Sequence, residues 1–97
     1  MIKARIEKGK IEVSGHAGYS EKGKDIICAG VSTLAQAAAL AIATYDETAQ
    51  LTAVEGHLLV TFTADDHYID GVITTLETGL NLIEGQYGEY LKVTCTR

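Results

Sequence analysis

The stretch from residue 65 to residue 88 restricts the possible folds of this chain more than any other part of it. Its apolar side chains recur every three or four residues without a gap, which is the spacing of one face of an α-helix. Asp65 or Asp66 is expected to cap the start of this helix, and Gly88 to end it. Such a helix needs an apolar partner surface, which the rest of the chain must provide. The residues of the apolar face are Ile69, Val72, Ile73, Leu76, Leu80, Ile83 and Tyr87.

Alternating apolar and polar residues predict that this partner surface is a β-sheet. Ile2, Ala4 and Ile6 alternate with charged residues, which is typical of a strand with one buried face. The Lys8-Gly9 pair is expected to turn the chain into the second arm of a hairpin. The expected strands cover residues 2–7, 11–14, 51–55, 58–63 and 90–96.

An alanine-rich segment predicts a first helix from residue 25 or 26 to residue 44, and its small side chains allow close approach to a sheet. We therefore expect one domain, residues 1–97, with the order strand, strand, helix, strand, strand, helix, strand. Its class is α+β: a two-layer sandwich of two helices on a mostly antiparallel sheet of about five strands. The apolar stripe of the first helix is Ile27, Val31, Leu34, Ala38, Ala41 and Ile42.

Charge and hydropathy restrict the partners of the chain and its location. The formal net charge of −5 argues against tight binding to RNA or DNA, which needs clustered Lys and Arg. The longest strongly apolar run, residues 31–44, is shorter than a bilayer span, and no signal-peptide core is visible at the N-terminus. We expect a cytoplasmic protein that spans no membrane, with both of its cysteines reduced.

Residues 15–34 hold the candidate chemistry. Cys28 lies just after Asp25, where the first helix is expected to begin, and a helix N-terminus stabilises a cysteine thiolate. His16 lies where the second strand ends, and a histidine brought alongside accepts the thiol proton. These residues alone leave a second possibility open, because a lone cysteine among apolar residues is more often a core side chain.

The same stretch resembles the signature of the ribosomal-processing cysteine proteases, a bacterial family. The resemblance rests on Gly15-His16-Ala17, a short variable loop, and the run Gly23-x-Asp25-Ile26-Ile27-Cys28-Ala29-Gly30-Val31-Ser32. It implies a cysteine endopeptidase in which Cys28 is the nucleophile and His16 is the base. It also implies the substrate: an N-terminal extension of a large-subunit ribosomal protein, cut after an aromatic pair. For relatives encoded by phages, the implied substrate is a capsid or scaffold protein with a similar tag.

Asp25 and Ser32 are expected to support this pair. Asp25 either only caps the helix or also orients His16, as the third member of a triad does. Ser32 lies one turn after Cys28, where a hydrogen bond near the thiol or back to the helix is expected. Free N–H groups at the start of the helix are expected to bind the oxyanion.

The polar loop of residues 18–24 separates the two candidate catalytic residues and suits a substrate-binding lid. A peptide is expected to lie as a strand beside the cleft, because so small a domain has little room for a deep pocket. A homodimer is expected because the edge strands are exposed, and the resemblance to the family also implies one. The loop residues assigned to substrate are Gly18, Tyr19, Gly23 and Lys24.

We expect no cofactor and no metal. His57 and His67 show no metal-ligand spacing with His16 or Cys28. Residues 18–25 nearly match a phosphate-binding loop, but an aspartate replaces the hydroxyl that binds magnesium. Cys95 is interpreted as a core residue, and no disulfide is expected. The alternative function is a non-catalytic cytoplasmic module that binds ribosomes or another protein, with a buried Cys28.

Overall fold

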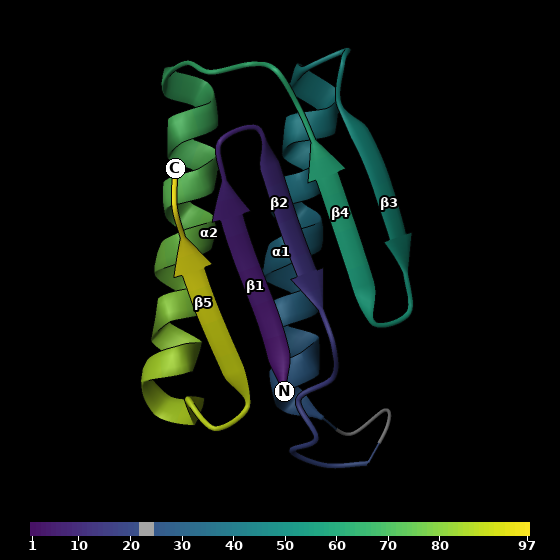
Figure 1. Ribbon diagram of the computed structural model, residues 1–97, viewed down its shortest axis with the longest axis vertical. Helices are drawn as coiled ribbons and strands as arrows, with labels where there is room; N and C mark the ends of the chain where they lie inside the picture. The colour runs from purple at the N-terminus through teal and green to yellow at the C-terminus, as the bar shows by residue number, and fades with distance from the viewer. Residues whose placement is uncertain (22–24) are drawn as a thin grey trace.

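The computed structural model describes residues 1–21 and 25–97. Within these residues the elements are β1 (Ile2–Glu7), β2 (Lys10–Ser14), α1 (Ile26–Tyr45), β3 (Gln50–Val54), β4 (His57–Thr61), α2 (His67–Tyr87) and β5 (Leu91–Cys95). The strands form one sheet, and both helices lie against the same face of it (Figure 1). The expected α+β sandwich and its order of elements are confirmed.

The strand order of the sheet is β3-β4-β2-β1-β5. Neighbouring strands pair antiparallel except β1 and β5, which run parallel with Ile2 opposite Leu91. The parallel pair follows from α2, because the chain crosses the helical face of the sheet before it returns as β5. The β1–β2 hairpin therefore lies in the interior of the sheet, and β3 and β5 are its edge strands.

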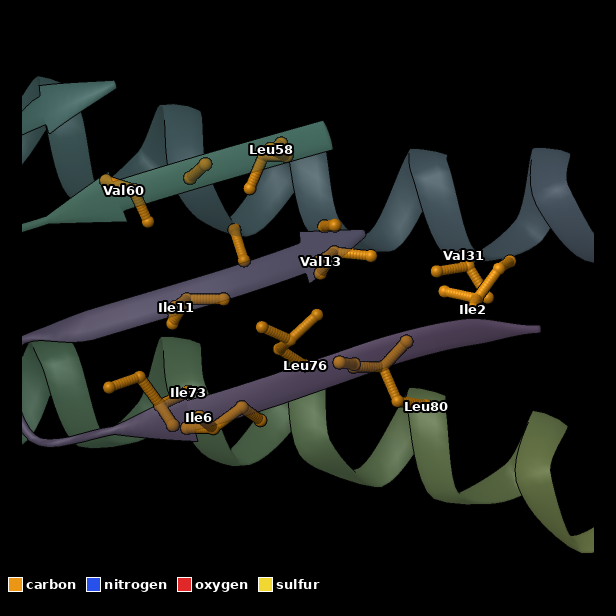
Figure 2. Close-up of a cluster of buried hydrophobic side chains, with 14 of the residues drawn as sticks. Ile2, Ile6, Ile11, Val13, Val31, Leu58, Val60, Ile73, Leu76 and Leu80 are labelled. Atoms are coloured by element: carbon orange, nitrogen blue, oxygen red, sulfur yellow. The ribbon is translucent and has the colours of Figure 1, made fainter. Parts of the chain in front are cut away.

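The core lies between the sheet and the helices. Inward side chains of β1, β2 and β4 meet the apolar faces of α1 and α2 (Figure 2). Leu58, Val60 and Phe62 face inward as expected, and all three are buried. The largest fully buried side chains are Ile6, Ile11, Ile27, Ile42, Ile69, Leu76, Leu80, Leu91, Val31 and Val60.

The buried face of α1 differs in part from the predicted stripe. Ala35 and Ala39 are buried, whereas Leu34 and Ala41 are only half-buried. The cause is that α1 packs against α2 as well as the sheet. Leu34 points at α2, where a Cβ added to Gly79 would lie 2.9 Å from its Cδ1 atom. Glycine at position 79 thus makes room for a leucine between the two helices.

Aspartates cap the start of α2 and the end of α1, whereas Gly88 is the C-cap of α2. Asp66, one of the two residues predicted for this role, is the N-cap of α2, and its Oδ1 atom accepts the N–H of Ile69. The C-cap of α1 is Asp46, which is buried. Its carboxylate accepts hydrogen bonds from the backbone and hydroxyl of Thr48 and from the N–H groups of Thr63 and Ala64. Asp46 therefore ties the end of α1 to the segment that follows β4.

Helix α1 is longer than the apolar run that predicted it. It has 20 residues, and an 18-residue window of it has a mean hydropathy of 1.9, so by length and composition it is long and apolar enough to cross a membrane. The expectation of a short segment concerned residues 31–44 alone, and the helix continues at both ends of that run. One face of α1 packs in the core against the sheet. Core helices of soluble proteins can have the same length and hydropathy as a membrane-spanning helix.

Cys95 is exposed, and its interpretation as a core residue was wrong. Leu91, Val93 and Cys95 do alternate along β5, but burial decreases from the first to the last. The reason is that β5 is an edge strand and Cys95 is its last residue. Cys28 and Cys95 are both free cysteines.

Candidate active site

Cys28 is the third residue of α1, where the helix dipole and the local hydrogen bonds act on its thiol. It is half-buried at the edge of the core. The Sγ atom accepts the backbone N–H of Ala17 at 3.3 Å. Ala17 is buried, so this donor is held in place. A donor aimed at the sulfur stabilises negative charge on it, and that charge makes a thiol nucleophilic.

Asp25 joins the loop that precedes α1 to the start of the helix. Its Oδ1 atom accepts the N–H groups of Ile27 and Cys28, each at 3.0 Å. Its Oδ2 atom accepts the N–H groups of Tyr19 at 3.0 Å and Ser20 at 3.4 Å. These bonds, that of Cys28 above all, hold the pKa of Asp25 below its ordinary value. The carboxylate thus acts as a cap and a loop anchor.

The backbone donors at the start of α1 are occupied. Ile27 and Cys28 donate to the Asp25 side chain, and Ala29 donates to the Asp25 carbonyl at 3.1 Å. The expectation that free N–H groups here bind an oxyanion was therefore wrong for these three residues. The sequence signal of an aspartate N-cap already implied that some of them would be satisfied.

His16 follows Gly15 at the end of β2 and is exposed. The N–H of Gly15 donates to the carbonyl of Gly56 at 2.9 Å, which ties the exit of β2 to the β3–β4 turn. The His16 ring lies against that turn. No hydrogen bond joins it to the Cys28 thiol or to Asp25 within residues 1–21 and 25–97.

One cleft of about 880 Å³ brings most of the predicted residues together. The N-terminal half of α1 borders it together with the ends of β3 and β4. Cys28, His16, Asp25, Ser32 and Gly18 all line it. Apolar side chains supply much of the remaining wall. The small ones are Ala29, Ala35 and Ala53, and the larger ones are Ile2, Val13, Val31, Val54 and Leu58.

Tyr19, assigned to the substrate loop, is not among the residues that line the cleft. Its ring packs edge-on against Tyr87 and Tyr90, with ring centroids 5.7 and 5.3 Å apart. The loop before α1 is therefore also anchored to the connection between α2 and β5. The predicted substrate residues Gly23 and Lys24 lie outside the described residues.

Gln36 is a cleft residue that sequence reasoning missed. Cys28, Ser32 and Gln36 are spaced by four, so they line one side of α1. The Gln36 amide donates to the Ser32 hydroxyl at 2.6 Å. The i, i+4, i+8 spacing from the nucleophile candidate was the signal that could have found it.

Within the described residues, no hydrogen bond joins Cys28 to either of the two other histidines, although His57 lines the same cleft. The His57 ring pairs with Glu12 at 2.8 Å on the side of the sheet that the helices leave uncovered. This bond, followed by the bond from Arg5, lowers the pKa of Glu12. His67 starts α2 and lines a separate groove between the helices. Among the described residues, no three His, Cys, Asp or Glu side chains form a metal-binding group.

Comparisons with known proteins agree with this geometry. The family model described as cysteine protease Prp matches residues 1–92. No curated protein matches the chain. The chain resembles the essential ribosomal processing protease Prp from S. aureus, solved with a covalently linked product peptide, at a TM-score of 0.87 and 23% identity. That likeness covers 99% of this chain and 100% of the other.

Two further solved structures have the same fold. The S. aureus protease in complex with a substrate peptide has a TM-score of 0.80 and 22% identity, over 99% of this chain and 100% of that one. SMU.848 from Streptococcus mutans has a TM-score of 0.74 and 22% identity, over 99% and 94%. At these identities the likeness shows the fold, and the match to the family model adds the class of enzyme.

Proposed function

The chain belongs to the family of the cysteine protease Prp, and on that premise we propose that it removes a short N-terminal extension from a large-subunit ribosomal protein in the cytoplasm. A phage structural protein with a similar tag is the other substrate of the same chemistry. The observation that carries the proposal is the position of Cys28. It lies at the start of α1 with an N–H aimed at its sulfur, and it shares a cleft with His16.

The proposed reaction is acyl transfer through Cys28. His16 takes the thiol proton, and Sγ attacks the scissile carbonyl carbon to form a C–S bond. His16 then gives the proton to the leaving nitrogen as the C–N bond breaks, which releases the mature protein with its new N-terminus. Water attacks the thioester carbon and gives one proton to His16, the C–S bond breaks, and that proton passes to Sγ. The extension leaves as a carboxylic acid, which loses the second proton to solvent and becomes a carboxylate.

The oxyanion of each tetrahedral intermediate needs a hydrogen-bond donor close to Sγ. We assign this role to the Ala17 N–H, whose bond to Sγ, 3.3 Å long in the free protein, is given up when the sulfur loses its negative charge to the carbonyl oxygen. During attack the negative charge moves from Sγ to the oxygen of the scissile carbonyl. One N–H in this position can therefore stabilise first the thiolate and then the oxyanion. Asp25 and Ser32 are positioning residues in this account: Asp25 anchors the helix start and the loop, and Ser32 meets Gln36 in the cleft wall.

The substrate is an extended peptide with an aromatic pair before the cut. Small alanine side chains in the cleft wall leave space for large side chains of a ligand. The complex of the S. aureus relative with a substrate peptide supports peptide binding at this fold. The test is a peptide with a polar residue, two aromatic residues and an alanine, analysed by mass spectrometry. We expect a cut after the aromatic pair and no cut when both aromatics are alanine; equal cleavage of the two peptides would contradict the proposal.

A homodimer is part of the proposal. The helices cover one face of the sheet, and within residues 1–21 and 25–97 no further element covers the other face or the edge strands β3 and β5. Val54, on β3, is an exposed apolar side chain. A second copy would cover these surfaces.

A further inference from the structure

The β3–β4 turn lies next to the His16 ring at Gly56. A Cβ atom added to Gly56 would lie 2.8 Å from His16 Nε2, 3.3 Å from Cε1 and 3.6 Å from Cδ2. The ring therefore occupies the space that a side chain at position 56 would fill. The Gly15 N–H to Gly56 carbonyl bond holds the two segments in this register.

We propose that Gly56 is a positioning residue for His16, a role that rests on the proposed function of His16 as the base. The bare backbone of the turn lets the ring lie against it and keeps the ring at the cleft. A general base must lie within hydrogen-bond reach of the proton that it takes. Any side chain at position 56 would push the ring away, because rotating an exposed ring costs less than moving two hydrogen-bonded strands.

Gly56 also has a backbone reason to be glycine, and the two reasons can be separated. Its φ of +77° lies in the left-handed region, which penalises most side chains. Asparagine tolerates this region better than alanine does, yet it brings the same Cβ. Gly56→Asn therefore reduces the strain and keeps the clash with His16. If Gly56 is needed only for its backbone conformation, Gly56→Asn should recover the kcat that Gly56→Ala loses.

Gly9 provides a matched control at the other end of the sheet. It lies in the β1–β2 turn with a φ of +73°, and its added Cβ would lie 2.8 Å from the Phe62 carbonyl oxygen. Gly9→Ala therefore brings a similar backbone strain, together with a clash against a backbone oxygen instead of the His16 ring. Gly9 is not among the residues that line the cleft.

The experiment measures kcat and KM on the peptide substrate and the His16 ring signals by NMR. We expect Gly56→Ala and Gly56→Asn to lower kcat by about 10-fold to 100-fold, with KM within about threefold, because small misplacements of a catalytic group are costly. The His16 signals should shift in both variants. Gly9→Ala should lower the melting temperature and leave kcat and the His16 signals unchanged.

A kcat within about twofold of the parent in Gly56→Asn, or unshifted His16 signals in that folded variant, would overturn the inference. If Gly56→Ala is too unstable to assay, Gly56→Asn carries the test. Failure of the proposed function has a different signature. In that case His16→Ala itself retains cleavage, while the NMR signals still report whether Gly56 positions the ring.

Discussion

The backbone N–H of Ala17 donates to the Sγ atom of Cys28 across 3.3 Å. This bond links the end of β2 to the first turn of α1, two segments that are eleven residues apart in the chain. His16 is the neighbour of Ala17, so the bond also restricts the backbone that carries the candidate base. The candidate nucleophile, the N–H that contacts it and the candidate base are therefore all positioned by the short segment between β2 and α1.

Asp25→Ala should disturb this junction. It removes the acceptor for two N–H groups of α1 and two of the preceding loop, so we expect a lower melting temperature and a lower kcat. Asp66→Ala is the matched control, because Asp66 caps α2 away from the cleft. It should lower the melting temperature and leave kcat unchanged. If both variants keep the kcat of the parent, Asp25 has no role beyond stability.

Asp46 should make stability depend on pH in the acid range. The Thr48 hydroxyl, followed by the N–H groups of Ala64, Thr48 and Thr63, holds its pKa well below the ordinary value of 3.8. The stabilisation is therefore complete above the ordinary carboxyl pKa and is lost as pH falls below it. Melting temperatures from pH 7 to pH 2 should fall less steeply for Asp46→Asn, which is less stable than the parent at neutral pH. Parallel curves would contradict this.

Iodoacetamide should alkylate Cys28 faster than Cys95 at neutral pH. Exposure alone favours Cys95, which lies open at the end of β5, whereas Cys28 is half-buried. Faster reaction of Cys28 would therefore report an activated thiol rather than access. His16→Ala should slow alkylation of Cys28 and leave that of Cys95 unchanged. Peptide mass spectrometry follows both sites in one sample, and faster labelling of Cys95 would count against activation.

Light scattering at micromolar concentration should give the mass of two chains. The expectation follows from the uncovered sheet face and the exposed edge strands. A charged substitution on the exposed side of β3, such as Val54→Lys, should weaken the dimer if the partner covers this edge. The mass of a single chain for the parent protein would refute the homodimer.

Most elements of the fold followed from hydrophobic periodicity, because β1, β2, β4 and α2 each have one buried face. The apolar face of α2 and the inward residues of β4 were predictable for this reason. The strand order was not, since a pattern of buried positions does not identify the neighbour of a strand. The parallel pairing of β1 with β5 depends on where the α2 crossover returns the chain.

The alternation of apolar and polar residues also could not predict how exposed a residue is at the edge of the sheet. Cys95 has the same alternation as Leu91, yet its place at the end of an edge strand exposes it. In the candidate site, the motif indicated Cys28, His16 and Asp25, which are close in sequence and line one cleft. Gly56 could not be found this way: it is forty residues from His16 and meets it only through the pairing of β2 with β4.

The most direct test of the account is cleavage of an extension-bearing peptide by four proteins: the parent, Cys28→Ala, His16→Ala and Cys95→Ala. Mass spectrometry identifies the products, and circular dichroism shows that each variant is folded. We predict that the parent and Cys95→Ala cut the peptide at equal rates after the aromatic pair, and that Cys28→Ala and His16→Ala do not cut it. Cleavage by folded Cys28→Ala or His16→Ala at a rate near that of the parent would contradict the assignment of nucleophile and base.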